Sequence, residues 1–255
     1  MATLDTFFYS DIGGRTENED SASILEEPGK GMLAVIADGL GGHGGGATAS
    51  QTALRTVLDQ FSAETVTEPA DLSPWFEKAN QEVSALQTPE CKMKTTMVLL
   101  HIKDDTAMWA HVGDSRLYHF VNGKLTDQTV DHSVSQMAVF RGEITADQIR
   151  GHEDRNRLTS ALGGSGKVRA ELSQKTSLQG AEHAFLLCTD GFWEYVYEAE
   201  MEQALQEASS AREWMEKMGL CLVSHAKPGH DNNSAAAIIW KESLIKGNKT
   251  EEKGL

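Results

Sequence analysis

The sequence predicts an α+β fold in which antiparallel sheets are layered with helices. Strand-like runs occur toward both ends of the chain, and the helical patterns between them do not alternate regularly with strands. The 255 residues are 40% hydrophobic, which suffices for a sizeable core, and no Pro/Gly/Ser-rich linker or internal repeat divides them. We therefore expect a single domain.

The first third of the chain predicts two strands followed by two helices. Apolar runs at residues 6–10 and 32–37 indicate the strands. Apolar side chains then recur at helical spacing over residues 46–61. A second helix is expected over residues 73–86, where Ser73 can cap the first turn and a proline follows it.

The middle third predicts a three-stranded antiparallel meander with short polar turns and an Asn-Gly pair after its last strand. These strands are expected over residues 95–102, 106–113 and 116–121. Residues 131–165 are polar and carry two short helical patterns, at residues 134–140 and 146–151. We interpret this segment as an excursion from the core.

The last third returns to strands and ends in a charged tail. The elements expected there are strands at residues 168–176, 183–189 and 234–240 and helices at residues 198–207 and 211–227. Residues 243–255 are charged and show no apolar periodicity, so we expect them to be disordered.

The composition excludes several classes of function. The formal net charge of −15 argues against nucleic-acid binding, which needs basic patches, and against binding to anionic membrane surfaces. No apolar run approaches the ~18 residues of a spanning helix, and the N-terminus lacks the features of a signal peptide. Cys91, Cys188 and Cys221 are odd in number and far apart, as expected of reduced thiols. We therefore expect a cytoplasmic protein with no membrane insertion.

Carboxylates stand where strands are expected to end. Asp38-Gly39 and Asp190-Gly191 each follow an apolar run. Further carboxylates in the GDS turn, before the last strand and in an N-terminal acidic pair are Asp114, Asp231, Glu19 and Asp20. Converging carboxylates stay ionised only when cations neutralise them, and oxygen ligands select hard ions such as Mg²⁺ or Mn²⁺. Two such ions about 4 Å apart can activate a water and bind a phosphoryl group.

Two other interpretations of these residues remain open. An Asp-Gly pair after an apolar run is also a hairpin signal, although a turn is compatible with metal binding. Gly39, Gly41 and Gly44 match the dinucleotide pattern G-x-G-x-x-G, with Asp59 about twenty residues further on. We disfavour a nucleotide-binding oxidoreductase, because Asp59 lies within a helical pattern and Asp38 would place negative charge beside a pyrophosphate.

Eight short motifs occur in one order between about residues 5 and 240. They are GGRTENEDS (13–21), ADGLGGHGGG (37–46), HVGDSRLYHF (111–120), DHSVSQ (131–136), GEIT (142–145), HEDRNRLTSALG (152–163), LCTDGFWE (187–194) and GHDNNSAAAI (229–238). The ordered set resembles the metal-dependent protein phosphatase family, the type-2C protein Ser/Thr phosphatases, in its bacterial form. This resemblance implies a four-layer α-β-β-α sandwich, with two antiparallel sheets flanked by helices. It also implies a catalytic domain over residues 1–242, with a flap at about residues 131–165.

The resemblance implies a centre of two Mn²⁺ or Mg²⁺ ions with a weaker third ion. Its ligands would be Asp38, Gly39, Asp190, Asp231, Glu19, Asp20 and Asp114. Asp38 would bridge both ions, the Gly39 carbonyl would bind one of them, and Asp114 would bind the third. Glu19 and Asp20 would hold the centre directly or through waters.

The resemblance assigns two further roles. Arg15 would bind the substrate phosphate, because a planar guanidinium meets two phosphate oxygens. His43 would be the general acid that protonates the leaving alkoxide. The residues themselves leave alternatives, since Arg15 could pair with Glu17 or Glu19 and His43 could simply be solvated in its glycine loop.

The remaining histidines and the flap arginines carry weaker expectations. Two histidines flank motif aspartates and are expected to support them, namely His132 and His230. The others are expected to be structural or exposed, namely His101, His111, His119, His152, His183 and His225. The flap arginines that could meet phosphorylated partners, or pair with flap acids, are Arg141, Arg150, Arg155 and Arg157.

The function that the resemblance implies is that of a metal-dependent protein serine/threonine phosphatase. It would hydrolyse phosphoserine and phosphothreonine in proteins by attack of a metal-bridging water or hydroxide. Stand-alone family members of this kind are expected to be monomers that oppose a bacterial Ser/Thr kinase, some of them in switches that control secretion systems. The alternative is a non-catalytic phosphoprotein-binding regulator on the same fold, against which the complete ligand set argues.

Overall fold

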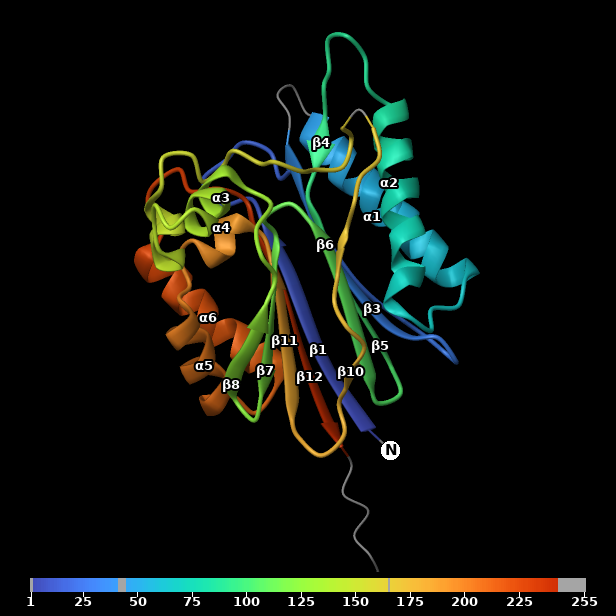
Figure 1. Ribbon diagram of the computed structural model, residues 1–255. Coiled ribbons are helices and arrows are strands. Elements are labelled where there is room, and N and C mark those ends of the chain that lie inside the picture. The colour runs from blue at the N-terminus through green and yellow to red at the C-terminus, as the bar shows by residue number, and fades with distance from the viewer. Residues whose placement is uncertain (1, 41–44, 165, 243–255) are drawn as a thin grey trace, which may run out of the picture.

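The computed structural model describes residues 2–40, 45–164 and 166–242. Two antiparallel sheets pack face to face, and helices cover the outer side of each sheet (Figure 1). This arrangement confirms the expected α+β sandwich of four layers. The predicted disordered tail at 243–255 lies outside the described residues.

The first sheet pairs the N-terminal strand with the last strand of the described chain. In spatial order it consists of β1 (Ala2–Asp11), β12 (Asn233–Glu242), β11 (His183–Cys188), β7 (Arg116–Val121) and β8 (Lys124–Gln128). β1 pairs with β12 along its whole length, from Ala2 opposite Glu242 to Asp11 opposite Asn233. The helices on its outer face are α5 (Glu198–Glu207) and α6 (Ala211–His225) (Figure 1).

The second sheet contains the long apolar strand of the N-terminal half. Its spatial order is β10 (Thr176–Ser177), β6 (Thr106–Val112), β5 (Met97–Lys103), β3 (Gly31–Leu40) and β2 (Asp20–Glu27). Two short strands extend it, β4 (Lys94–Thr95) beside β3 and β9 (Glu171–Leu172) beside β6. Its outer face is covered by α1 (Gly45–Ala63) and by α2 (Ser73–Ala85), which follows the 3₁₀ turn η1 (Pro69–Leu72) (Figure 1).

Strand β3 is buried on both faces. Met32 and Ile36 point into the core between the two sheets, while Leu33 and Val35 pack in the core under α1 and α2. Side chains of a strand alternate between its faces, so a strand covered on both sides is a continuous apolar run. This explains the uninterrupted apolar sequence that ends at Asp38.

The expected meander is wrong in its last strand. β5 and β6 form an antiparallel pair, but the chain then crosses to the other sheet, where β7 pairs with β8 and β11. The crossing starts at Gly113, whose φ of 104° favours glycine and whose added Cβ would lie 2.6 Å from Thr96. A short polar turn does not reveal whether the next strand returns to the same sheet, so the sequence could not predict this crossing.

Smaller differences concern single elements. The strand expected at 168–176 is reduced to the two-residue strands β9 and β10, and the strands β2 and β8 were not predicted. Ser73 begins α2 instead of capping it, because the turn η1 runs directly into the helix. The two helical pieces of the flap segment are present as expected, as α3 (Val134–Phe140) and the 3₁₀ helix η2 (Ala146–Gly151).

No helix in the described part of the chain is long and apolar enough to cross a membrane. The three cysteines are free thiols, and Cys188 is buried.

Candidate active site

Four aspartates from separate segments gather at one edge of the sandwich. Asp38 lies in β3, directly opposite Asp20 of β2. Asp190 begins the short helix α4 (Asp190–Trp193) after β11, and Asp231 stands shortly before β12. β3 continues past Asp38, and Asp190 starts a helix, so neither Asp-Gly pair forms the hairpin turn considered from the sequence.

Burial and mutual repulsion raise the pKa of three of these carboxyl groups, those of Asp38, Asp20 and Asp190. Burial raises the pKa of Asp38 well above its ordinary value, and the charges of Asp20 and Asp190 add to the effect. Burial raises the pKa of Asp20 to about 7, although hydrogen bonds from Ser234 and Thr189 favour its ionised form. The pKa of Asp190 also rises to about 7, chiefly through burial. The cluster therefore lacks the positive charge that its ionised form needs.

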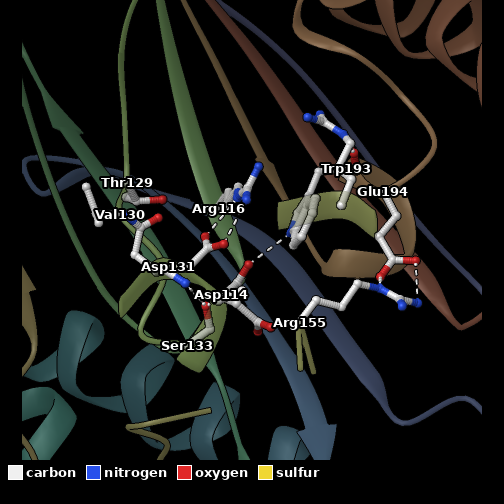
Figure 2. Close-up of polar contacts among 12 residues, drawn as sticks. Asp114, Arg116, Thr129, Val130, Asp131, Ser133, Arg155, Trp193 and Glu194 are labelled. Carbon is white, nitrogen blue, oxygen red and sulfur yellow. Dashed lines mark hydrogen bonds and ion pairs between the residues drawn. The ribbon is translucent and has the colours of Figure 1, made fainter. Parts of the chain in front are cut away.

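Asp114 joins this cluster from the crossing between the sheets. Burial raises its pKa, with the charge of Asp190 as the next cause, and its own charge acts on Asp38. The indole Nε1 of Trp193 donates a 2.9 Å hydrogen bond to the Asp114 carbonyl (Figure 2). This bond fixes the turn that carries Asp114 against helix α4. We call Asp20, Asp38, Asp114, Asp190 and Asp231 the aspartate cluster.

Glu19 lies between the aspartate cluster and helix α1. Its Oε1 accepts a 3.1 Å hydrogen bond from the Gly46 amide near the start of α1, and burial raises its pKa. Its backbone carbonyl accepts a 3.1 Å bond from the Gly39 amide. A Cβ on Gly39 would lie 2.2 Å from the Gly46 carbonyl oxygen, so only glycine fits beside Asp38.

Arg15 pairs with the aspartate cluster. Its Nη2 donates a 2.6 Å hydrogen bond to Asp231 Oδ2, and the two side chains are 52% and 37% exposed. In the described part of the chain, Arg15 does not form the ion pairs with Glu17 or Glu19 that the sequence left open. An exposed guanidinium at the rim of the cluster can meet an incoming phosphate.

Two residues that hold the site together were not singled out from the sequence. The Asn232 side chain bonds three backbone groups of the segment 12–19, at 2.8 to 2.9 Å. Thr189 Oγ1 donates a 3.0 Å hydrogen bond to Asp20 and accepts one from the Ser234 amide. Asn232 directly follows Asp231, and Thr189 directly precedes Asp190. Their position beside predicted metal ligands is the sequence signal that could have identified them.

A buried ion pair lies beside the aspartate cluster, at the base of the flap (Figure 2). Arg116 binds both carboxylate oxygens of Asp131, at 2.7 and 2.8 Å. Its guanidinium lies 3.6 Å from the centroid of the Trp193 ring. Asp131 thus has a buried cation of the protein as its partner, whereas the cation that meets the aspartate cluster, Arg15, is half exposed.

The flap arginines divide into two groups. Arg141 and Arg157 form ion pairs with acidic residues of the flap itself. Arg150 and Arg155 instead bind glutamates that follow α4, and Arg150 also donates to two backbone carbonyls there. The second group therefore fastens the flap to the segment that carries Asp190.

The chemistry of the donors fits hard divalent cations. The structure brings together the predicted side-chain ligands Asp20, Asp38, Asp114, Asp190 and Asp231, with Glu19 and the Gly39 backbone at the border. Carboxylate oxygens are the ligands that Mg²⁺ and Mn²⁺ prefer. His43, with Gly41 and Gly44, lies outside the described residues, so its role as a general acid stays a prediction.

Comparison with known proteins identifies the family of this chain. Residues 9–227 match the family described as Protein phosphatase 2C. The chain belongs to the protein phosphatase 2C family. This phosphatase is 31% identical to the serine/threonine phosphatase stp of Listeria innocua, over 94% of its own length and 97% of the relative's.

Solved structures place the phosphatase among metal-dependent enzymes. The catalytic domain of the serine/threonine protein phosphatase PstP, in complex with two manganese ions, is 27% identical with a TM-score of 0.79, covering 95% of this chain and 100% of that one. PppA, a regulatory component of the type VI secretion system in Pseudomonas aeruginosa, is 26% identical with a TM-score of 0.73, covering 93% of this chain and 99% of that one.

The structure also bears on the dinucleotide interpretation of the glycine loop. That interpretation required Asp59 at the end of a strand, but Asp59 lies within α1.

Proposed function

We propose that this protein serine/threonine phosphatase hydrolyses phosphoserine and phosphothreonine in proteins at the aspartate cluster, using two Mn²⁺ or Mg²⁺ ions and a weaker third. One observation carries the proposal, namely that Asp38 stands directly opposite Asp20 in the sheet, where burial and the charges of neighbouring aspartates raise its pKa. Such a cluster can remain ionised only with bound cations. When bound, these ions supply an activated water and neutralise charge on the phosphoryl group.

The proposed ligand assignment is supported by the grouping of these residues at one end of β2 and β3. Asp38 would serve both main ions. The Gly39 carbonyl, Asp190 and Asp231 would complete the main sites, and Asp114 would hold the third ion. Two residues at the β2 end of the cluster contribute directly or through waters, namely Glu19 and Asp20.

Two side chains act on the substrate. Arg15 lies exposed at the rim of the cluster, and its guanidinium binds the phosphate oxygens. The serine or threonine oxygen that leaves needs a proton, and we assign its donation to His43. Exchanging Arg15 for lysine should raise KM more than it lowers kcat, since a point charge replaces a planar fork.

The physiological setting is part of the proposal. We infer that the enzyme is a monomeric cytoplasmic protein that opposes a Ser/Thr kinase. The likeness to PppA supports control of a secretion system as its setting. Phosphoproteomics of a deletion strain tests this, because sites of one kinase should gain occupancy together, whereas unchanged phosphorylation would contradict the proposal.

Metal removal tests the chemistry directly. The metal-stripped enzyme should hydrolyse neither an aryl phosphate nor a phosphothreonine peptide, and added Mn²⁺ should restore both activities. Asp190→Asn should stay inactive with Mn²⁺, while Asp59→Asn, which alters an exposed carboxylate on α1, should behave as the wild type. Full activity of Asp190→Asn would refute the metal assignment, and phosphopeptide binding without turnover by the wild type would favour the regulator.

A further inference from the structure

A second group of metal-binding side chains lies outside the aspartate cluster. His111, His132 and Glu171 each offer one ligand atom, and these atoms lie within 4.8 Å of one another. His111 of β6 and Glu171 of β9 are directly opposite each other in the sheet, and His132 stands at the base of the flap. His132 Nε2 lies 3.4 Å from Glu171 Oε2, close to the ~3.3 Å that separates two ligands of a tetrahedral ion with bonds of about 2.0–2.1 Å.

His111 is already prepared as a ligand. Its Nε2 hydrogen bonds to the Val130 carbonyl at 2.8 Å, so this nitrogen carries the proton and the lone pair is on Nδ1. Metal-binding histidines commonly donate their other ring N–H to a backbone carbonyl in this way. Burial lowers the pKa of His111, which favours the neutral form that a metal requires. Its ring stacks on that of His132, with centroids 4.7 Å apart, so one of the two rings must turn for both to bind one ion.

We propose that His111, His132 and Glu171 bind one divalent transition ion, such as Zn²⁺ or Cu²⁺, separately from the aspartate cluster. Two imidazoles and one carboxylate favour such ions over Mg²⁺, which prefers oxygen ligands only. An entry path exists, because His111 and Glu171 line a surface cavity of about 400 Å³. Three protein ligands leave the fourth position of a tetrahedral ion to water.

Binding at this site acts on the turn that carries Asp114. His132 Nδ1 accepts a 3.2 Å hydrogen bond from the Gly113 amide, so the ring proton of neutral His132 is on Nε2. When Nε2 binds an ion, this proton moves to Nδ1, and the Gly113 amide loses its acceptor. Gly113 directly precedes Asp114, so the transition ion loosens one contact of that turn. The backbone bond from the His132 amide to the Gly113 carbonyl, at 2.9 Å, remains.

Copper electron paramagnetic resonance tests the site without relying on activity. The full chain is saturated with Mg²⁺, which is silent in this measurement and occupies the oxygen ligands, and half an equivalent of Cu²⁺ is added. We expect nitrogen hyperfine splitting from two imidazoles in the wild type. Copper bound only by the aspartate cluster would show no nitrogen coupling, and this result would overturn the proposal.

Two variants locate the copper ligands, and a third serves as the control. His132→Gln should reduce the coupling to one nitrogen, and Glu171→Gln should keep two nitrogens but weaken copper binding about tenfold or more. Both side chains reach the surface, so these variants avoid the packing risk of changing the buried His111. His225→Gln, which removes an exposed histidine of α6, should leave the wild-type spectrum. Two-nitrogen coupling that persists in His132→Gln would refute the assignment.

The link to the Gly113 turn has its own measurement. Zn²⁺ added to the Mg²⁺-saturated, ¹⁵N-labelled wild type should shift the Gly113 amide resonance and speed its hydrogen exchange. The His132→Gln variant should show neither response to Zn²⁺. An unchanged Gly113 amide in a wild type that binds Zn²⁺ would overturn the proposed coupling.

Discussion

Two neighbouring regions of this phosphatase solve the same problem, the burial of aspartate, in opposite ways. Asp131 is buried against Arg116, which binds both of its oxygens. The aspartate cluster nearby gathers five carboxyl groups, and Arg15 meets it only at the exposed rim. The charge of Asp131 is compensated within the protein. The charges of the aspartate cluster are not compensated by a buried side chain and need cations from solution, and this uncompensated charge distinguishes the active site.

The largest expected effect comes from breaking the completed pair. Arg116→Met leaves Asp131 buried without a partner and should lower the free energy of unfolding by about 3–5 kcal/mol. Adding Asp131→Leu should recover most of this loss, because a well-packed apolar pair can replace a buried ion pair. Urea denaturation in EDTA measures both changes. Equal stability of Arg116→Met and wild type would contradict the view that this pair is structural.

Neutralising a member of the aspartate cluster should lower activity without lowering stability, the opposite of the effect of Arg116→Met on stability. Asp38→Asn should reduce kcat/KM at least about a hundredfold, since altering groups that merely support metal ligands already costs roughly 10–100-fold. In EDTA the same variant should be no less stable than the wild type, because it removes a charge that its neighbours repel. Steady-state kinetics and urea denaturation measure the two effects. A metal-free Asp38→Asn as unstable as Arg116→Met would erase the contrast between the regions.

The pH dependence of stability should distinguish the metal-free from the metal-bound protein. In the absence of metal, the pKa of Asp20 and of Asp190 rises from 3.8 to about 7. Between these values the folded state binds more protons than the unfolded state, so the free energy of unfolding falls as pH rises from about 4 to about 7. Excess Mn²⁺ should abolish this fall. Urea midpoints across that range, measured with EDTA and with Mn²⁺, provide the test, and identical slopes would count against it.

The smallest effect is expected at an exposed ion pair of the flap. Arg141 pairs with Glu143 at 2.7 Å, and both side chains are more than half exposed. Water already solvates these charges, so Arg141→Gln should leave the urea midpoint unchanged within error. A shift comparable with that of Arg116→Met would mean that burial is not what separates the ion pairs.

The sequence predicted the part of the site that local patterns encode. Asp38 and Asp190 follow apolar runs, and a strand buried on both faces has such a run, so their place at the sheet edge was readable. The pairing of Arg116 with Asp131 could not be predicted from the sequence. It depends on the chain crossing at Gly113 from the sheet of β5 and β6 to the sheet that contains β7. Register and sheet membership arise from tertiary packing, which no single segment contains.

The group of His111, His132 and Glu171 shows the same limit. His132 was expected to support the motif aspartate beside it, and His111 was expected to be structural or exposed. Glu171 comes beside His111 only through the two-residue strand β9. The sequence predicted a longer strand over 168–176 but not which strand it pairs with or in which register. The residue opposite His111 could therefore not be identified.

The full-length pairing of β1 with β12 has a consequence for the timing of synthesis. Residues 2–11 emerge from the ribosome before the rest of the described chain, yet their partner strand is translated more than two hundred residues later. Domains fold as units while the chain grows, and non-local strand pairs form slowly. Asp38 and Asp20 are thus made long before Asp231, which precedes β12. A ribosome-bound chain that stops short of residue 231 should therefore have no phosphatase activity, and the first strand stays unpaired until the last one arrives.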